Sequence, residues 1–256
     1  MSEREDKGER PIKVPGQESV TTPLPKRFYS EVAVRTEPDG NFGVLLDGRA
    51  VRTPAKLPLT VPTRALAEAI AAEWSAQTEN IDPATMPLSK LAITAIDGVA
   101  QHVSEVAEDI VRYAGSDLLC YRAEGPQALA ELQAKVWDPI VHWFEAETGS
   151  RFLFAEGIMP VTQTPEALEG VARLVAPFDS FALAGLHVMT TLTGSAALAL
   201  ATARGRLSAD EAWAAAHLDE DWQIARWGVD VEAKERRERR WADMQAAARF
   251  LELIRQ

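Results

Sequence analysis

The stretch FALAGLHVMTTLTGSAALALATA, residues 181 to 203, contains no Asp, Glu, Lys or Arg and is long enough to cross a bilayer as a helix. It is rich in Ala, Thr, Gly and Ser rather than in Leu, Ile and Phe, and no other segment of the chain resembles it. A helix that is apolar on all sides fits either a membrane or the centre of a helical bundle. The composition favours the buried central helix, and membrane association through this segment stays the alternative.

The sequence around this segment, from Pro126 to the C-terminus, has helical periodicity almost throughout. The pattern predicts helices over 127–149, 165–177, 208–228 and 231–254, with one short strand in RFLFAEGI, residues 151–158. We therefore expect residues 126–256 to form an all-helical C-terminal bundle domain around the apolar segment.

The sequence before Pro126 begins with strand patterns and ends with helical ones. Strands are predicted in FYSEVAVRT (28–36), NFGVLL (41–46), RAVRT (49–53) and LPLTVP (57–62), with a hairpin turn at Asp47-Gly48. Thr63 is a predicted N-cap for the first of three helices. Residues 25–125 are thus predicted to form a small N-terminal β-sheet-containing domain, and the polar residues 1–24 a disordered arm. The predicted fold class is α+β.

Composition excludes several classes of function. A hydrophobic content of 46% supports a globular protein with a large core. A formal net charge of -11 argues against nucleic-acid binding, which depends on Lys and Arg. The single cysteine, Cys120, cannot form an intrachain disulfide and indicates a reducing compartment. With no signal-peptide pattern at the N-terminus, we expect a cytoplasmic location in a bacterium.

The common catalytic and ligand-binding motifs are missing from the sequence. It contains no Gly-rich phosphate loop, no cysteine pair for zinc, no H-E-x-x-H and no G-x-S-x-G. His142 has Glu145 one helical turn on, and His217 has Glu220 and Asp221, but neither group has an evident third ligand. We expect both histidines to be structural and predict no metal and no cofactor.

The segment LDEDWQIARWG, residues 218–228, places three acids beside two tryptophans. On one continuous helix, an apolar and aromatic stripe passes through Trp213, His217, Glu220, Ile224 and Trp227. Glu220 interrupts that stripe, whereas Asp219 and Asp221 are expected to flank it toward water. Trp222 is one turn from Arg226, a spacing that predicts a cation-π contact.

Glu220 is the anomaly in this segment, because a carboxylate on an apolar stripe is costly to bury without a partner. It pairs with a donor inside the protein, or it meets a cation of a binding partner. In the second case Asp219, Glu220, Trp222 and Trp227 form a partner-binding site, with the aromatic side chains as anchors. A third interpretation is an enzyme that uses Glu220 as general acid or base in an interdomain cleft.

Eight stretches spread over the chain resemble one family, the F-type ATP synthase assembly chaperones that bind the α subunit of the catalytic head. They are RFY (27–29), LDGRAVRTP (46–54), AEWSAQ (72–77), MPLSKLAITAID (86–97), LLCYRAEGP (118–126), QAKVWDPI (133–140), TGSAALALA (193–201) and LDEDWQIARWGVDVEA (218–233). Trp74 and Trp137 lie in these stretches at core spacing, so we expect both to be packing residues.

The resemblance implies a β-containing N-terminal domain, a helical C-terminal domain, and ATP-independent binding rather than catalysis. The implied partner is the free α subunit, whose β-facing surface the chaperone covers until assembly. The family carries a functionally important acid in the motif that LDEDWQ matches. The match itself does not separate Asp219 from Glu220, whereas the stripe favours Glu220. We expect a monomer without stable membrane insertion, cytoplasmic in bacteria and in the mitochondrial matrix in eukaryotic relatives.

Overall fold

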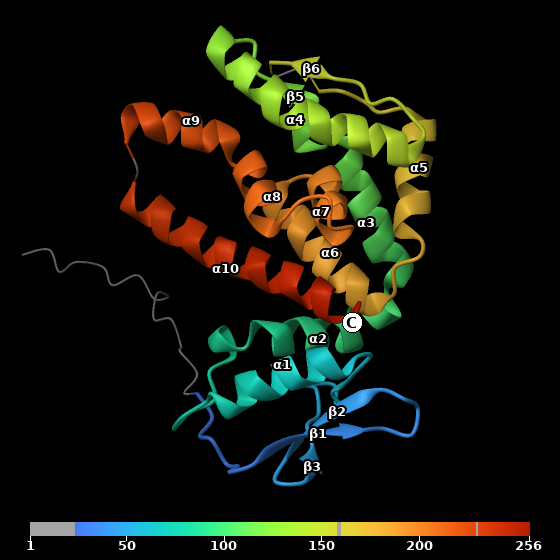
Figure 1. Ribbon diagram of the computed structural model, residues 1–256, viewed down its shortest axis with the longest axis vertical. Helices are drawn as coiled ribbons and strands as arrows, with labels where there is room; N and C mark the ends of the chain where they lie inside the picture. The colour runs from blue at the N-terminus through green and yellow to red at the C-terminus, as the bar shows by residue number, and fades with distance from the viewer. Residues whose placement is uncertain (1–23, 158–159, 229) are drawn as a thin grey trace, which may run out of the picture.

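A computed structural model of the protein describes residues 24–157, 160–228 and 230–256. The predicted arm therefore lies outside the described residues except for Leu24. A small sheet lies at one end of the molecule and is followed along the chain by helices, which confirms the α+β class (Figure 1). Helices α1 (Arg64–Ser75) and α2 (Pro87–Asp97) lie between the sheet and the other helices (Figure 1).

The sheet consists of the predicted hairpins, although its later strands are shorter than predicted. Strands β1 (Val32–Thr36) and β2 (Phe42–Leu46) pair antiparallel, and β2 also pairs with β3 (Arg49–Ala50) and β4 (Thr60–Val61). Asp47 and Gly48 have φ of 48° and 76°, the left-handed pair that a two-residue hairpin turn requires. The Thr63 hydroxyl caps α1 by accepting from the Leu66 N–H, as predicted.

We call residues 24–97, the sheet with α1 and α2, the sheet unit. Helix α2 joins this unit to the bundle, because it packs on both α6 (Ser180–Thr193) and α10 (Val231–Leu253). Helix α3 (Val103–Gly115) lies before residue 125 but packs mainly on α6 and on α5 (Pro165–Val175). Strands β5 (Tyr121–Arg122) and β6 (Ala155–Glu156) form a short parallel pair beside α4 (Gln127–Thr148) (Figure 1). The division into domains near residue 125 stays a prediction.

The apolar segment lies at the centre of the bundle, as predicted, but it forms two helices rather than one. Helix α6 ends at Gly194, whose φ of 68° is left-handed, and Ser195 then caps α7 (Ala196–Ala203). All eight residues of α7 are buried. Gly185 of α6 allows a close approach, since a Cβ there would lie 3.0 Å from Leu251 Cγ of α10. The segment therefore supplies the core of the bundle.

None of the helices in the described ranges combines the length and the apolar character needed to span a bilayer.

The two tryptophans expected to pack differ in their surroundings. Trp137 is only 1% exposed, and its indole Nε1 donates to the Ala215 carbonyl oxygen at 2.9 Å. Trp74 is half-buried against the core of the sheet unit, and its carbonyl oxygen accepts from the Tyr29 hydroxyl at 2.7 Å. Both pack as predicted, but Trp74 keeps an open side.

Candidate functional site

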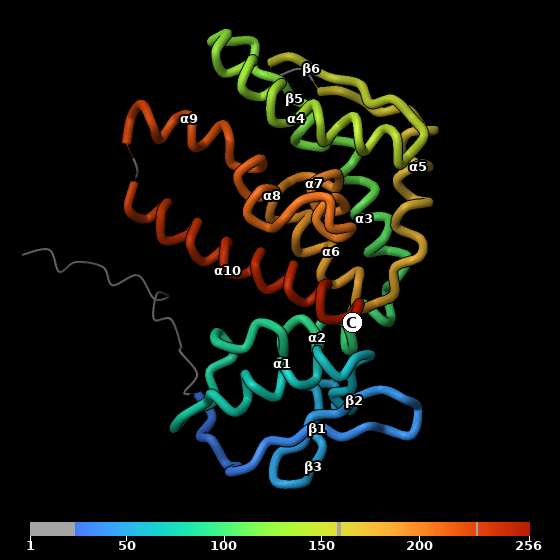
Figure 2. The backbone as a smooth tube through the Cα atoms, viewed as in Figure 1, coloured from blue at the N-terminus to red at the C-terminus, as the bar shows by residue number. Residues whose placement is uncertain are grey.

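The segment predicted as one helix over 208–228 is in fact two helices with a bend at His217. Helix α8 (Ala209–Ala216) ends there, and α9 (Leu218–Trp227) begins at the next residue. Backbone angles of φ -108° and ψ 17° at His217 are outside the helical range. The predicted stripe from Trp213 to Trp227 is therefore wrong as a continuous face. Trp213 and His217 are buried, whereas the backbone of α9 leads away from α8 in a new direction (Figure 2).

The bend is stabilised by the histidine itself. The His217 ring lies 3.8 Å, centroid to centroid, from the Trp213 ring, and its Nδ1 is 2.9 Å from the Trp213 carbonyl oxygen. Burial lowers the pKa of His217, and the hydrogen bond to Trp213 opposes that effect. His217 is thus a structural residue, as expected, at the point where α8 ends and α9 begins.

Asp219 fixes α9 to α4. Its Oδ1 accepts from the Gln133 Nε2 at 2.8 Å. The same Gln133 side chain, which is 1% exposed, accepts through Oε1 from the Ala123 N–H at 2.8 Å. The buried amide therefore links the residue after β5 to α4 and α9, so Asp219 positions α9, and its contact with a partner stays a prediction.

The other two acids of α9 lie near one cation of α10. Arg237 Nη1 lies 2.5 Å from Asp221 Oδ1 but 3.9 Å from Glu220 Oε2. The hydrogen bond that Arg237 donates to Asp221 raises the pKa of Arg237, with the charges of Asp221 and Glu220 adding to it. The Glu220 side chain keeps 44% of its surface exposed, and that of Asp221 50%. Glu220 is thus the acid of the three whose carboxylate has no short hydrogen bond in the described residues.

The two tryptophans of α9 differ in exposure. Trp222 is half-buried, and the Arg226 guanidinium carbon lies 3.4 Å from its ring centroid, which confirms the predicted cation-π contact. Trp227 is 78% exposed at the end of α9. Val231, at the start of α10, is 69% exposed, and both helix ends lie at the same edge of the molecule (Figure 1).

Helical spacing separates the four predicted site residues into two groups. Glu220 and Trp227 are seven residues apart and share one face of α9. Asp219 and Trp222 share another face, the one on which Asp219 contacts α4. We call Glu220, Trp227 and Val231 the acid-aromatic surface. It presents one carboxylate and two large apolar side chains to solvent.

The enzyme interpretation finds no support in this geometry. His217 is buried and bonded to a backbone oxygen, and Glu220 lies on an outer helix rather than in a cleft. The exposed His142 lies near Glu145, whose carboxylate is already occupied by the Phe152 N–H at 3.0 Å. Across 24–157, 160–228 and 230–256, no three His, Cys, Asp or Glu side chains are grouped as metal ligands would be.

Sequence reasoning missed the residues that decide which acid is available. Gln133 donates a hydrogen bond to Asp219, and Arg237 donates one to Asp221. Glu220 is therefore the acid of the three that lacks a short hydrogen bond in the described residues. Gln133 is 86 residues before its partner, so no local spacing could have indicated that bond. Arg237 lies in a run of charged residues whose pattern fits many helix surfaces.

The protein resembles known proteins along nearly its whole described length. The family model of the ATP12 chaperone protein matches residues 26–145. Protein atp12, mitochondrial, of Schizosaccharomyces pombe is 27% identical over 232 residues, which cover 84% of this chain and 79% of that protein.

Two solved bacterial structures share both sequence and fold with it. The Atu1473 protein of Agrobacterium tumefaciens is 51% identical with a TM-score of 0.86, covering 90% of this chain and 86% of that one. Atp12 from Paracoccus denitrificans is 43% identical with a TM-score of 0.85, covering 90% of this chain and 98% of that one. Identity of this size over almost the entire length of both chains shows common ancestry, and the chain belongs to the ATP12 chaperone family.

Proposed function

We propose that this protein is an ATP-independent assembly chaperone. It binds the unassembled α subunit of F-type ATP synthase and covers the surface that later meets the β subunit. Membership of a chaperone family supports a role in binding rather than in catalysis. The observation that carries the proposal is the acid-aromatic surface, in which Glu220, Trp227 and Val231 are exposed on helices that project from the bundle (Figure 1).

An exposed tryptophan two helical turns from an exposed carboxylate on the same face suits recognition of a protein. Trp227 offers a large rigid area that becomes buried only when a partner covers it. Glu220 is 3.9 Å from Arg237, so a closer cation of the client can take its carboxylate without first breaking a short hydrogen bond. We infer that Trp227 supplies affinity and that Glu220 fixes the orientation of the client.

The same surface suits a client that must later be released. It consists of a few side chains at the end of two helices, so the area it buries is small compared with a permanent interface. A subunit interface that competes for the client's apolar surface can then displace the chaperone. A monomeric chaperone in the bacterial cytoplasm, without cofactor, meets these requirements.

Capture of separately expressed α and β subunits tests the proposal. Tagged wild-type protein is expected to retain α and not β. Glu220→Gln and Trp227→Ala should reduce α retention, whereas Asp210→Asn, at an exposed acid in the first turn of α8, should not. Each variant is melted beside the wild type to show that it is folded. Failure of the wild type to retain α, or equal retention by all variants, would contradict the proposal.

A further inference from the structure

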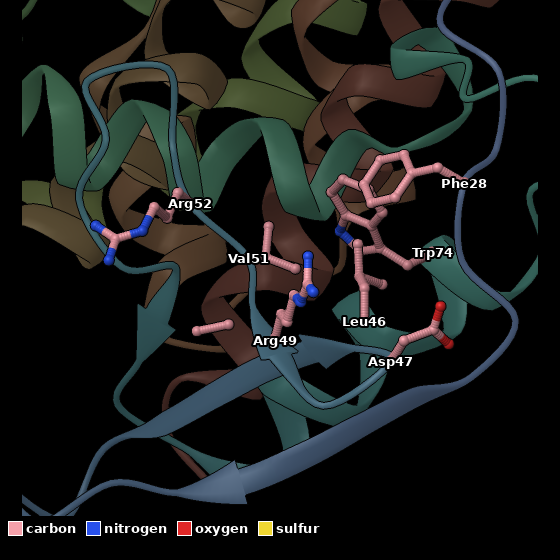
Figure 3. Close-up of a pocket in the computed structure, with 8 residues that line it drawn as sticks. Phe28, Leu46, Asp47, Arg49, Val51, Arg52 and Trp74 are labelled. Atoms are coloured by element: carbon pink, nitrogen blue, oxygen red, sulfur yellow. The ribbon is translucent and has the colours of Figure 1, made fainter.

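A cavity of about 690 Å3 opens on the sheet unit, away from the acid-aromatic surface (Figure 3). Its side chains come from the segment before β1, from the β2–β3 hairpin and from α1. We call it the sheet pocket. Three of the stretches that carry the family resemblance, at 27–29, 46–54 and 72–77, meet there. Nothing in the proposed role of α9 uses it.

One side of the sheet pocket is aromatic and apolar. Phe28, which is 74% exposed, and Trp74 both line it (Figure 3). The Phe28 ring contacts the Tyr29 ring edge to face at 5.4 Å. Leu46 and Val51, both buried, also line the pocket. A pocket lined by an exposed phenylalanine and a tryptophan is a site where a large apolar side chain of a ligand gains most from burial.

The polar groups of the pocket are mainly donors without acceptors. The Trp74 Nε1 is buried and has no hydrogen-bond partner among the described residues, and in Figure 3 it lies on the side that faces Arg49 and Val51. An indole N–H can only donate, and buried polar atoms are rarely left unpaired. The exposed Arg49 guanidinium is likewise without a hydrogen bond or ion pair in the described ranges. Both groups call for an acceptor from a ligand.

The acid in the pocket, Asp47, is held mainly by backbone donors. Asp47 accepts from the N–H groups of Ser30 at 3.0 Å and Glu31 at 2.8 Å, and these bonds lower its pKa, with the charges of Arg27 and Arg49 adding to the effect. Arg52 also lines the pocket, but in Figure 3 its guanidinium points away from Phe28 and Trp74, and it donates to the Lys56 carbonyl oxygen. The lining thus carries two arginines against one aspartate in a protein of net charge -11, which favours an acidic ligand.

The position of the pocket favours an extended peptide. Strand β3 ends the order β1-β2-β3 and has two residues, and both of them line the pocket. The free backbone groups of an edge strand can pair with a strand from another chain. Such a peptide would place one side chain toward Phe28 and the side chain two residues on toward Arg49, because residues i and i+2 of a strand share a face.

We propose that the sheet pocket binds a short extended segment of the client in which a large apolar residue is two positions from an Asp or Glu. The apolar side chain packs between Phe28 and Val51, and the carboxylate accepts from Arg49. Because the Trp74 Nε1 is buried, an acceptor of the bound segment reaches it only when a side chain that lines the pocket moves aside. This proposal rests on the proposed function, because the segment belongs to the α subunit.

Photo-crosslinking identifies the occupant directly. A benzoyl-phenylalanine in place of Phe28 keeps an aromatic side chain at an exposed position, and irradiation with the α subunit is followed by mass spectrometry. We expect crosslinks to one α segment with an acid two positions from a large apolar residue, and competition by a synthetic peptide of that segment. Crosslinks only within the chaperone or to a second copy of it, or scattered over α, would overturn the proposal.

Matched substitutions test the recognised chemistry. Arg49→Gln and Trp74→Phe should each weaken capture of α about tenfold, the size expected for one lost hydrogen bond to a charged group. Arg35→Gln on β1, where the arginine pairs with Glu37, removes the same charge outside the pocket and should bind normally. Because Arg49 is exposed, its variant should fold even if the Trp74 variant does not.

The outcomes separate the two proposals. No capture of α by the wild-type protein would overturn both. Capture that is lost in Glu220→Gln but unchanged in Arg49→Gln would overturn only the sheet pocket as a binding site.

Discussion

The two helices α7 and α9 lie close together in the sequence but are held in place by different forces. All eight residues of α7 are buried, whereas Leu218 is the only buried residue of α9. Packing in the core fixes α7, and a few polar bonds to Gln133 and Arg237 fix α9. The comparison shows that the region proposed to bind the client contributes little to the core, so it can be altered without unfolding the protein.

The largest effect is expected in α7. Leu198 is fully buried, so Leu198→Ala should lower the free energy of unfolding by about 2 to 5 kcal/mol, the range for a leucine cavity in a packed core. Chemical denaturation followed by circular dichroism measures the change. A loss below about 1 kcal/mol would show that α7 is less tightly packed than its burial indicates.

A smaller loss of stability is expected where α9 meets α4. Asp219→Ala leaves the buried Gln133 amide without its acceptor, which should cost about 1 to 3 kcal/mol. Gln133→Met is the comparison, because it removes both polar groups and leaves Asp219 to water. If Asp219→Ala unfolds like the wild type but loses α capture, Asp219 contacts the client and is not only a positioning residue.

The bend at His217, where α9 begins, should make the stability of the protein depend on pH. Burial lowers the pKa of His217 in the folded state, so the unfolded state binds more protons below the ordinary pKa of about 6.5. The contribution of His217 is therefore full above that pH and is lost as the pH falls below it through the lower pKa of the folded state. Unfolding curves from pH 8 to pH 5 should show a smaller decline for His217→Gln than for the wild type. An identical decline would place the sensitive group elsewhere.

The smallest change in stability is expected at the end of α9. Trp227 is 78% exposed, so Trp227→Ala should change the free energy of unfolding by less than about 0.5 kcal/mol. Its retention of the α subunit should nevertheless fall clearly below that of the wild type. A large loss of stability would show that Trp227 belongs to the core and not to the acid-aromatic surface.

Local patterns predicted much of the fold correctly. The Asp47-Gly48 turn, the Thr63 cap, the burial of the apolar segment and the Arg226 contact with Trp222 all follow from spacings of four residues or fewer, or from composition. These features depend on residues that are neighbours in the chain, so the sequence alone contains their cause.

Features that depend on distant residues could not be predicted. The helical period continues through 208–228, and only the packing of His217 on Trp213 in the core reveals the bend. The partners of Asp219 and Asp221 come from α4 and α10. Trp74 has the sequence spacing of a core residue. Only the folded structure shows that it also lines a pocket with Phe28 and the β2–β3 hairpin.

The Gln133 side chain makes one position far from α9 intolerant of replacement. Its acceptor end is used by the Ala123 N–H and its donor end by Asp219. A glutamate there would set two carboxylates against each other, and an asparagine is one methylene too short to reach both partners. A genetic screen for chaperones that fold but no longer recognise their client should therefore recover changes at residue 133, because loss of its bond to Asp219, 86 residues on, displaces α9 and with it Glu220.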